Sequence, residues 1–353
     1  MFQFDELGEN RRRRINQFID LCHRHVAQYT IISVEPLIFF MPMLLDLSHF
    51  VRDYGLLFDS LKERQVFFIC SPSWYFERSQ NISELKNLLD KYICDYPKFT
   101  FIIICNTKKL LNLYNEKNIK AVFCNNNCFI DENLFFPITP PAEEKYDAVY
   151  DARLVDWKRH PLAESIHSLA IIFYAIPWYE DNSYMKKIFR DFAHAHFFNH
   201  SDTGKCRKLS PLEINQALNR CRVGLCLSAE EGAMYASIQY LLAGLPVVTT
   251  PNVGGRDEFF DDEISITVEP TPEAVKAGVA EMIGRNLDPH YVRAKTLERM
   301  KVHRGYFISL IQSIYEQEGI GRDFSIEWKS IFFNKLLRNR NHLKTINDLN
   351  QIN

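Results

Sequence analysis

One segment of the sequence brings together an acid, free backbone donors and a second polar side chain. Glu231 stands in a predicted turn after a strand, and a helix is predicted to run from about Met234 to Ala243. The first N–H groups of a helix have no partner within it and suit an anion such as phosphate. Those of Gly232, Ala233 and Met234 are the candidates. A carboxylate beside a phosphate needs another partner, and sugar hydroxyl groups can donate hydrogen bonds to it.

The same predicted helix carries Gln239, which could reach further hydroxyl groups. Gly244 suits the first position after the helix, and Pro246 prevents its continuation. An alternative interpretation stays open. In that interpretation Glu231 only complements the helix dipole, and Gln239 is a solvated residue of the helix surface.

Two cations follow the first predicted strand of the second half. Arg153 comes directly after this strand, and Lys158 stands five residues later, before a helix predicted from about Pro161. Arginine offers a planar fork for phosphate oxygens and lysine offers a point charge, so the pair could neutralise a pyrophosphate leaving group. A pair of surface cations without a ligand is the alternative.

The elements that must position these residues are short apolar strands alternating with helices. Continuous apolar runs of this kind are typical of strands covered on both faces, and the alternation predicts parallel, doubly wound sheets. The predicted strands are residues 30–34, 66–70, 100–105, 121–124, 148–150, 169–175, 223–227, 247–249 and 264–268. The predicted helices include residues 82–92, 211–221, 234–243 and 272–285.

A proline-rich stretch divides the chain. Residues 136–145 contain three prolines and a charged run, which is typical of a linker. We therefore predict an α/β fold with two Rossmann-like, doubly wound domains, over residues 1–142 and 143–300. A helical tail over residues 301–353 is predicted to pack back on the first domain. Two facing domains leave a cleft, and ligands of such sheets bind outside the carboxyl ends of the strands.

Composition excludes several classes of protein. The 353 residues are 46% hydrophobic and 24% charged with a net charge of -2, which argues against a broad nucleic-acid-binding surface. No apolar stretch reaches the roughly 20 residues that span a bilayer. The N-terminus has no signal-peptide pattern, and the nine scattered cysteines form no C-x-x-C pair. A cytoplasmic protein with reduced thiols is expected, and the histidines at 194, 196 and 200 lack the spacing of a metal site.

Two basic segments raise the question of a membrane surface. Residues 331–340 are predicted to form a helix with an apolar and a basic face, and Arg11–Arg14 opens another helical pattern. Packing on the body of the protein is one interpretation. Peripheral contact with the anionic inner face of a membrane is the other.

Four segments in register resemble motifs of retaining glycosyltransferases with the GT-B fold, in the large family four group, also called glycosyl transferases group 1. Residues 231–248 resemble the E-G motif that ends in G-x-P-V-V, and residues 152–158 resemble G-R-L-x-x-x-K. Residues 125–137 resemble the N-G-V-D segment at the domain junction, and residues 250–258 resemble T-x-x-G-G-x-x-E. The likeness covers roughly residues 125 to 285.

This resemblance implies a role for each matching position. Arg153 and Lys158 would hold the donor diphosphate, and Glu231 would bind hydroxyl groups of the transferred sugar. Gln239 would stand at the nucleotide ribose. The remaining donor-binding positions would be the amides of Gly232, Ala233 and Met234 at the distal phosphate, Leu209 and Ser210 near the nucleobase, and the glycine pair Gly254 and Gly255.

The implied activity is transfer of a sugar from a nucleotide-sugar donor with retention of configuration. The acceptor would be a glycan, a lipid-linked molecule or another molecule bound by the first domain. Analogy of fold places this activity in surface polysaccharide assembly. Neither a metal nor another cofactor is expected, because protein cations and amides stabilise the departing phosphate.

The sequence departs from the family pattern in three places. Gln239 replaces a glutamate, which would weaken nucleotide binding about fivefold if a neutral acceptor replaces a charged one. Arg159 stands where the family often has glycine. The first half lacks a clear glycine-rich acceptor loop, and only Ser71, Ser73 and Trp74, with His49 as a guess, are candidates to line the cleft.

Two rival functions therefore stay open. A catalytically degenerate protein that binds a sugar nucleotide is one of them, motivated by Gln239. A GT-B sugar-nucleotide epimerase is the other. It would need acid and base residues that converge on the sugar, and the sequence does not display them.

Overall fold

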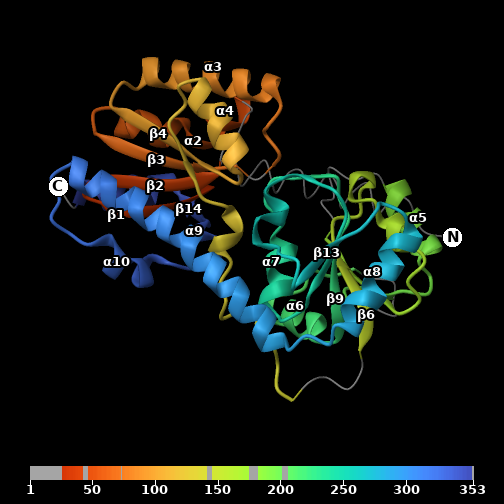
Figure 1. Ribbon diagram of the computed structural model, residues 1–353. Helices are drawn as coiled ribbons and strands as arrows, with labels where there is room; N and C mark the ends of the chain where they lie inside the picture. The colour runs from red at the N-terminus through yellow and green to blue at the C-terminus, as the bar shows by residue number, and fades with distance from the viewer. Residues whose placement is uncertain are drawn as a thin grey trace. The chain divides into compact units, whose positions relative to one another are not determined.

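The computed structural model describes residues 26–42, 47–72, 74–140, 145–174, 182–200 and 206–351 (Figure 1). The chain divides into two compact units, of which unit 1 comprises Met1–Phe129 with His303–Asn353 and unit 2 comprises Ile130–Val302. The first division falls before the proline-rich stretch. Residues of that stretch bind helix α6 (Pro211–Leu218) of unit 2 and the residue after it, because Phe136 N donates to Asn215 Oδ1 and Ile138 N donates to Asn219 Oδ1.

Unit 1 contains a six-stranded sheet in the order β14-β1-β2-β3-β4-β5. Strands β2 to β5 are parallel, whereas β1 runs antiparallel to both of its neighbours. The strands are β1 (Val26–Val34), β2 (Leu37–Pro42), β3 (Val66–Ser71), β4 (Phe99–Cys105), β5 (Ala121–Phe123) and β14 (Arg338–Asn341). The helices before the crossover to unit 2 are α2 (Leu47–Leu61), α3 (Ser79–Asp95) and α4 (Lys108–Glu116).

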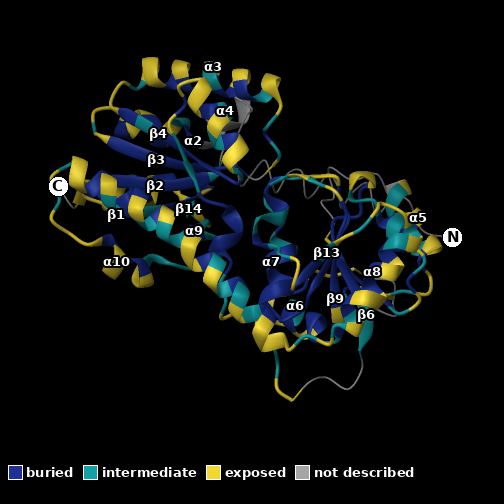
Figure 2. Ribbon diagram, viewed as in Figure 1, coloured by how far each residue is buried: buried dark blue, intermediate teal, exposed yellow. Residues whose placement is uncertain are grey.

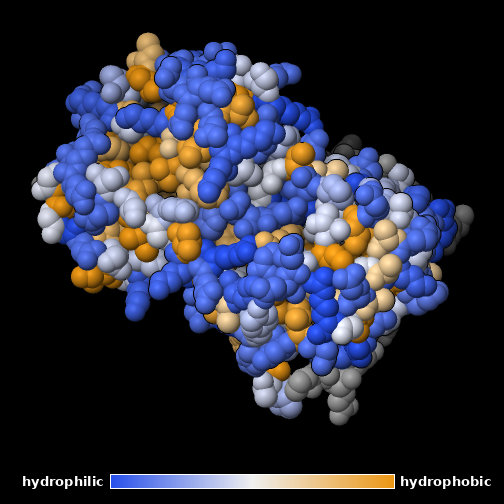
Figure 3. Space-filling model, viewed as in Figure 1, coloured by the Kyte–Doolittle hydropathy of each residue, from blue (hydrophilic) through white to orange (hydrophobic). Residues whose placement is uncertain are grey.

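The core of unit 1 is rich in aromatic residues. Phe58 of α2 packs on Phe68 of β3, with ring centroids 4.8 Å apart, and Phe68 stacks on Phe101 of β4 at 5.2 Å. Figure 2 shows β2, β3 and β4 buried and an alternation of exposed and buried positions along α3. Apolar residues are also visible over these strands in the space-filling view of unit 1 (Figure 3). The strands are apolar on both faces, as expected for a sheet covered from two sides.

Strand β2 was not among the predicted strands. Its residues, LIFFMP, form a short apolar run that periodicity alone does not separate from a buried helical segment. The structure resolves the ambiguity by pairing, because β2 lies between β1 and β3 and exchanges backbone hydrogen bonds with both.

The predicted amphipathic helix over residues 331–340 is wrong. Helix α10 (Phe324–Ile331) ends where that helix should begin, and Lys335 and Leu336 adopt left-handed φ values of 67° and 53°. The following residues form β14, which pairs antiparallel with β1. Pairing with β1 provides hydrogen-bond partners for the backbone groups of this segment. The contact with β1 therefore overrides the local helical pattern. The other helices of the C-terminal segment are α9 (Pro289–Gln317) and α11 (His342–Gln351).

Unit 2 contains a six-stranded, entirely parallel sheet in the order β13-β11-β9-β6-β7-β8. Its strands are β6 (Tyr146–Asp151), β7 (Leu169–Ile172), β8 (His196–Phe197), β9 (Cys221–Cys226), β11 (Val247–Thr249) and β13 (Ser265–Thr267). Besides α6, its helices are α5 (Asn182–Asp191), α7 (Tyr235–Leu242) and α8 (Pro272–Gly284). A short parallel pair joins β10 (Glu230–Glu231) to β12 (Val253–Gly254). The predicted α/β class with Rossmann-like sheets and a helical C-terminus is confirmed.

Helices α7 and α8 cover opposite sides of this sheet (Figure 1). Gly224 of β9 allows the ring of Tyr240 on α7 to lie against the strand, because a Cβ atom at this glycine would stand 2.3 Å from the ring. Gly278 of α8 plays the same part on the other side, where its Cβ atom would meet Val268 at 2.8 Å. Small residues at both contacts let the helices approach the strands closely.

The end of helix α7 agrees with the prediction. Gly244 has a left-handed φ of 85°, and Leu245 N donates to Tyr240 O at 2.9 Å. This is the arrangement expected of a glycine just past a helix. Among the described residues, no helix combines the length and the apolar character needed to cross a membrane.

Candidate functional site

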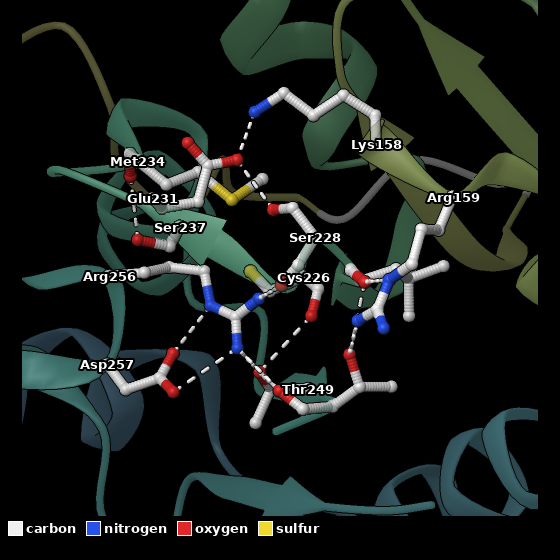
Figure 4. A network of polar contacts seen from close by, with 12 residues as sticks. Lys158, Arg159, Cys226, Ser228, Glu231, Met234, Ser237, Thr249, Arg256 and Asp257 are labelled. Atoms are coloured by element: carbon white, nitrogen blue, oxygen red, sulfur yellow. Dashed lines mark hydrogen bonds and ion pairs between the residues drawn. The ribbon is translucent and has the colours of Figure 1, made fainter. Parts of the chain in front are cut away.

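The candidate site lies where parallel strands of unit 2 end (Figure 4). The carboxyl ends of neighbouring parallel strands meet at one edge of a sheet, which is where ligands of such sheets bind. The loop after β6 supplies Lys158, which ends the short 3-10 helix η2 (Asp156–Lys158). The turn after β9 supplies Ser228 and Glu231, and the loop after β11 leads into the 3-10 helix η4 (Gly255–Phe259).

Glu231 and Lys158, which are 73 residues apart in the sequence, form an ion pair. Lys158 Nζ donates to Glu231 Oε1, and the hydroxyl group of Ser228 donates to the same oxygen at 2.5 Å. The two charged side chains are only 12% and 11% exposed. Within the part of the chain that the structure describes, Glu231 Oε2 accepts no hydrogen bond. The pair therefore neutralises two nearly buried charges and leaves one carboxylate oxygen for a ligand.

The backbone after Glu231 offers further donors. Met234 is the N-cap of α7 and makes no side-chain capping bond. In the described ranges, the N–H groups of Gly232, Ala233 and Met234 donate to no protein acceptor. Three neighbouring N–H groups before the first turn of a helix are a suitable site for an anion.

Gln239 is buried rather than solvated. Its exposed fraction is 7%, and its side-chain amide makes no hydrogen bond to any residue that the structure describes. The interpretation of Gln239 as a solvated residue of the helix surface is therefore wrong. The amide atoms of Gln239 are not among the buried polar atoms that lack a partner, so they reach the surface and are candidates to contact a ligand.

Arg153 lies at the end of β6, beside the aromatic ring of Tyr174. The guanidinium carbon lies 5.4 Å from the centre of this ring, a cation–π arrangement. Arg153 is itself only 7% exposed, whereas Tyr174 is 47% exposed. Arg153 is thus a largely desolvated cation at the same edge of the sheet as Lys158.

The residues predicted near the nucleobase take part in the start of α6. Ser210 is the N-cap of this helix, and its hydroxyl oxygen accepts a hydrogen bond from Glu213 N at 3.3 Å. Glu213 reaches back to Ser210 N at 2.8 Å, which completes a capping box. Leu209 is buried with 7% exposure. Their contact with a base stays a prediction.

The glycine pair supports the turn that carries Glu231. Gly254 pairs with Glu231 in the β10–β12 bridge, and its φ of 108° lies in the region that favours glycine. Gly255 N donates to Gly232 O at 2.8 Å. The structure thus joins the loop of Gly254 and Gly255 to the turn of Glu231, and a contact of the glycine pair with a donor stays a prediction.

Arg159 occupies the position where the resembling family often has glycine, and it does so in a left-handed conformation. Its φ and ψ are 53° and 42°, a region in which residues with a Cβ atom are strained. Its Nε donates to Leu227 O at 2.6 Å and its Nη2 to Thr250 Oγ1 at 2.7 Å. The guanidinium group of Arg159 is thus hydrogen-bonded at the ends of β9 and β11.

Sequence reasoning missed a pair of aromatic supports behind Lys158. Tyr150 donates from its hydroxyl group to Lys158 O at 2.5 Å, and the ring of His160 lies 4.9 Å from that of Tyr150. Burial, followed by the charge of Lys158, lowers the pKa of His160 to about 3. His160 Nδ1 lies 3.3 Å from the hydroxyl oxygen of Tyr184. A neutral imidazole therefore packs beneath the loop that presents the lysine.

Arg256 was also missed as a functional residue. Its side chain is completely buried and forms hydrogen bonds to Ser228 O, Thr249 Oγ1, Thr250 O and the carboxylate of Asp257. The sequence around it, GGRDE, carries no pattern that would distinguish this arginine from a solvated one.

The candidates in unit 1 are less connected to one another. Ser71 at the end of β3 donates to Asn126 Oδ1 at 2.7 Å, and Trp74 is 53% exposed. His49 belongs to α2, but its side chain lies outside the described residues, as do Ser73 and Arg11–Arg14. No group of three or more His, Cys, Asp or Glu side chains is arranged to hold a metal ion in the described ranges.

Comparisons with known proteins agree on the fold. No protein-family model matches the sequence, and no curated protein matches it either. The solved structure of HepE from Anabaena in complex with UDP matches with a TM-score of 0.53 at 14% identity, over 79% of this chain and 78% of that chain. The HepE complex with UDP-glucose matches with a TM-score of 0.51, at the same identity and coverage. TarM from S. aureus matches with a TM-score of 0.52 at 13% identity, over 77% of this chain and 54% of TarM.

The class of the protein follows from the fold and these likenesses. Two Rossmann-like units, one of them with an entirely parallel sheet, give the chain the GT-B fold of glycosyltransferases that the sequence predicted. Because the sequence identities are only 13% and 14%, these likenesses establish the fold and nothing further.

Proposed function

We propose that the protein is a glycosyltransferase that uses a nucleotide-sugar donor. The observation that carries the proposal is the Lys158–Glu231 ion pair at the carboxyl edge of the parallel sheet, beside three backbone N–H groups that donate to no acceptor among the described residues. This arrangement supplies a cation and amides for a diphosphate, and a carboxylate oxygen for sugar hydroxyl groups.

The ion pair has a direct role in the proposed chemistry. In the structure, Glu231 neutralises Lys158, so a nearly buried cation has a partner. When the donor binds, Lys158 and Arg153 face its phosphates. The amides of Gly232 to Met234 meet the distal phosphate, and Glu231 accepts hydrogen bonds from the sugar. Cations and amides that face the departing diphosphate stabilise its developing charge, and this requires no metal ion.

Donors that contain UDP are the first to test. HepE, which has the same fold, is known in complexes with UDP and with UDP-glucose. In the proposed complex Gln239 contacts the ribose, and Leu209, Ser210 and the Gly254–Gly255 pair line the rest of the donor site. The transfer proceeds with retention of configuration. These assignments rest on the resemblance of the sequence motifs.

We further propose that the acceptor is a glycan or a lipid-linked molecule of surface polysaccharide assembly, on the cytoplasmic side of a membrane. This part of the proposal also rests on the resemblance. The segment 331–340 does not support a membrane contact through a basic helix, because it contains β14.

Calorimetric titration with UDP, GDP, ADP, CMP and dTDP tests the donor class. We expect one of them to bind, and Lys158→Ala to weaken this binding by at least about tenfold, because a charge-assisted contact to phosphate is lost. Lys187→Ala is a matched control, because Lys187 forms an ion pair with Asp191 at 2.7 Å on α5. Unchanged affinity of the Lys158 variant would contradict its phosphate role.

Transfer itself needs a separate measurement. With the donor found by calorimetry, release of the nucleoside diphosphate in the presence of candidate acceptors reports turnover. Glu231→Ala should reduce it by orders of magnitude while leaving the fold intact. Binding without any turnover, across a broad acceptor panel, would favour the degenerate sugar-nucleotide-binding protein instead.

A further inference from the structure

We propose that Arg256 and Ser228 act together as a relay that orients the Glu231 carboxylate, and that this relay selects the intact sugar nucleotide over the bare nucleotide. The inference rests on the proposed function. It names two positioning residues that act through Glu231.

The guanidinium group of Arg256 joins three segments of chain at the floor of the site (Figure 4). Its Nη1 donates to Ser228 O at 2.6 Å, at the end of β9. Its Nη2 donates to Thr249 Oγ1 at 2.5 Å and to Thr250 O at 2.7 Å, at the end of β11. Its Nε donates to Asp257 Oδ1 at 2.6 Å.

A charge with no exposed surface is costly unless it is paired and fully hydrogen-bonded. Arg256 meets both conditions, because Asp257 balances its charge and each of its three side-chain nitrogens donates to at least one oxygen. A planar fork of five donors can bind several acceptors at fixed angles, which a lysine ammonium group cannot reproduce. Arg256 therefore fixes the ends of β9 and β11 relative to each other.

Ser228 passes this constraint on to Glu231. Its carbonyl oxygen is held by Arg256, and its hydroxyl group donates to Glu231 Oε1 at 2.5 Å. Ser228 is itself fully buried. The backbone of Glu231 is held from the same loop, because Glu231 pairs with Gly254 two residues before Arg256. Side chain and backbone of the acid are thus set by one buried cluster.

The relay acts on the sugar end of the donor only. With Oε1 occupied by Ser228 and Lys158, the carboxylate presents Oε2 to a sugar hydroxyl group. The groups proposed for the phosphates, which are Arg153, Lys158 and the amides after Glu231, do not depend on the Ser228 hydroxyl group. Loss of this hydroxyl group should therefore weaken a sugar nucleotide more than the nucleotide without its sugar.

The test compares the dissociation constants of UDP and UDP-glucose by calorimetry for the full chain and for Ser228→Ala. We expect the constant for UDP-glucose to rise about fivefold to tenfold, the equivalent of one ordinary net hydrogen bond, and that for UDP to change less than about twofold. Ser265→Ala is the matched control, because it removes another buried hydroxyl group, one that donates to Asp261 O at 2.7 Å on β13. Both constants should stay unchanged in this control.

Arg256→Lys tests the other half of the relay. This variant keeps the positive charge and loses the planar set of donors. The dissociation constant of UDP-glucose should therefore rise relative to that of UDP, as in Ser228→Ala. The double variant, with both Ser228→Ala and Arg256→Lys, should change the ratio of the two dissociation constants by less than the product of the two single changes. The reason is that both residues act on Glu231 through the same contacts. If Arg256→Lys does not fold, Ser228→Ala alone decides the question.

Each outcome separates the two proposals. A wild-type chain that binds none of UDP, GDP, ADP, CMP and dTDP, and none of their sugar conjugates, contradicts the proposed function. A wild-type chain that binds both UDP and UDP-glucose, with a Ser228→Ala variant that weakens both equally or neither, overturns the relay and leaves the proposed function intact.

Discussion

The neutral state of His160 makes the stability of unit 2 sensitive to pH in a defined window. Burial and the charge of Lys158 lower the pKa of the folded histidine to about 3, whereas an exposed histidine titrates near 6.5. As the pH falls below about 6.5, the unfolded chain takes up a proton at this position and the folded chain does not. The contribution to stability is therefore fully present above this pH and is lost progressively as the pH falls towards 3.

The magnitude follows from the two pKa values. Between pH 7 and pH 5, a histidine with pKa values of about 3 folded and 6.5 unfolded contributes a loss of about 2 kcal/mol in the free energy of unfolding. The window above pH 5 is useful because most carboxylates titrate below it. Protonation would also place a second cation behind Lys158, in the loop that presents it to the proposed donor.

Urea denaturation at pH 7, 6 and 5 measures this loss. His160→Gln should be less stable than the wild type at pH 7, because the amide fills the site less well. Its free energy of unfolding should nevertheless fall about 2 kcal/mol less between pH 7 and pH 5. His200→Gln, at an exposed histidine, serves as the control and should retain the wild-type slope. Equal slopes for the wild type and His160→Gln would refute the reasoning.

Two further predictions concern single side chains. Gly244→Ala should lower the free energy of unfolding by more than about 1 kcal/mol, because φ is 85° and the new Cβ atom would lie 2.8 Å from the Pro289 backbone. Gly284→Ala, where a Cβ atom meets nothing within 4 Å, should leave stability equal or raise it in thermal unfolding, and similar losses in both variants would contradict this account. Gln239→Glu should tighten binding of the preferred nucleotide about fivefold if this side chain contacts the ribose. Weaker binding in calorimetry would mean that burying a carboxylate costs more than the added hydrogen bonds contribute.

Much of the fold could be predicted because its signals are local. Apolar runs separated by helical patterns identified most strands of both sheets, and Gly244 with Pro246 marked the end of α7. The strands β2 and β14 could not be identified in the same way. A short apolar run and a basic, polar run become strands only because neighbours offer them hydrogen bonds.

The candidate site shows the same division. Glu231 and Lys158 were selected from their residue types and their positions after predicted strands, and the structure brings them into contact across 73 residues of sequence. Their types limit the chemistry to charge and hydrogen bonding whatever surrounds them. Their partnership with Ser228, and the oxygen that remains available, depend on geometry that residue spacing does not contain.

The sequence by itself determined the kind of fold and the chemical groups at the edge of the parallel sheet, because periodicity and residue type are properties of short segments. Only the tertiary structure decided that Arg256 is a buried clamp, that Arg159 adopts a left-handed conformation, and that His160 stays neutral. Burial and hydrogen bonding depend on atoms contributed by distant segments. The same arginine or histidine would be solvated and ordinary if those segments did not meet.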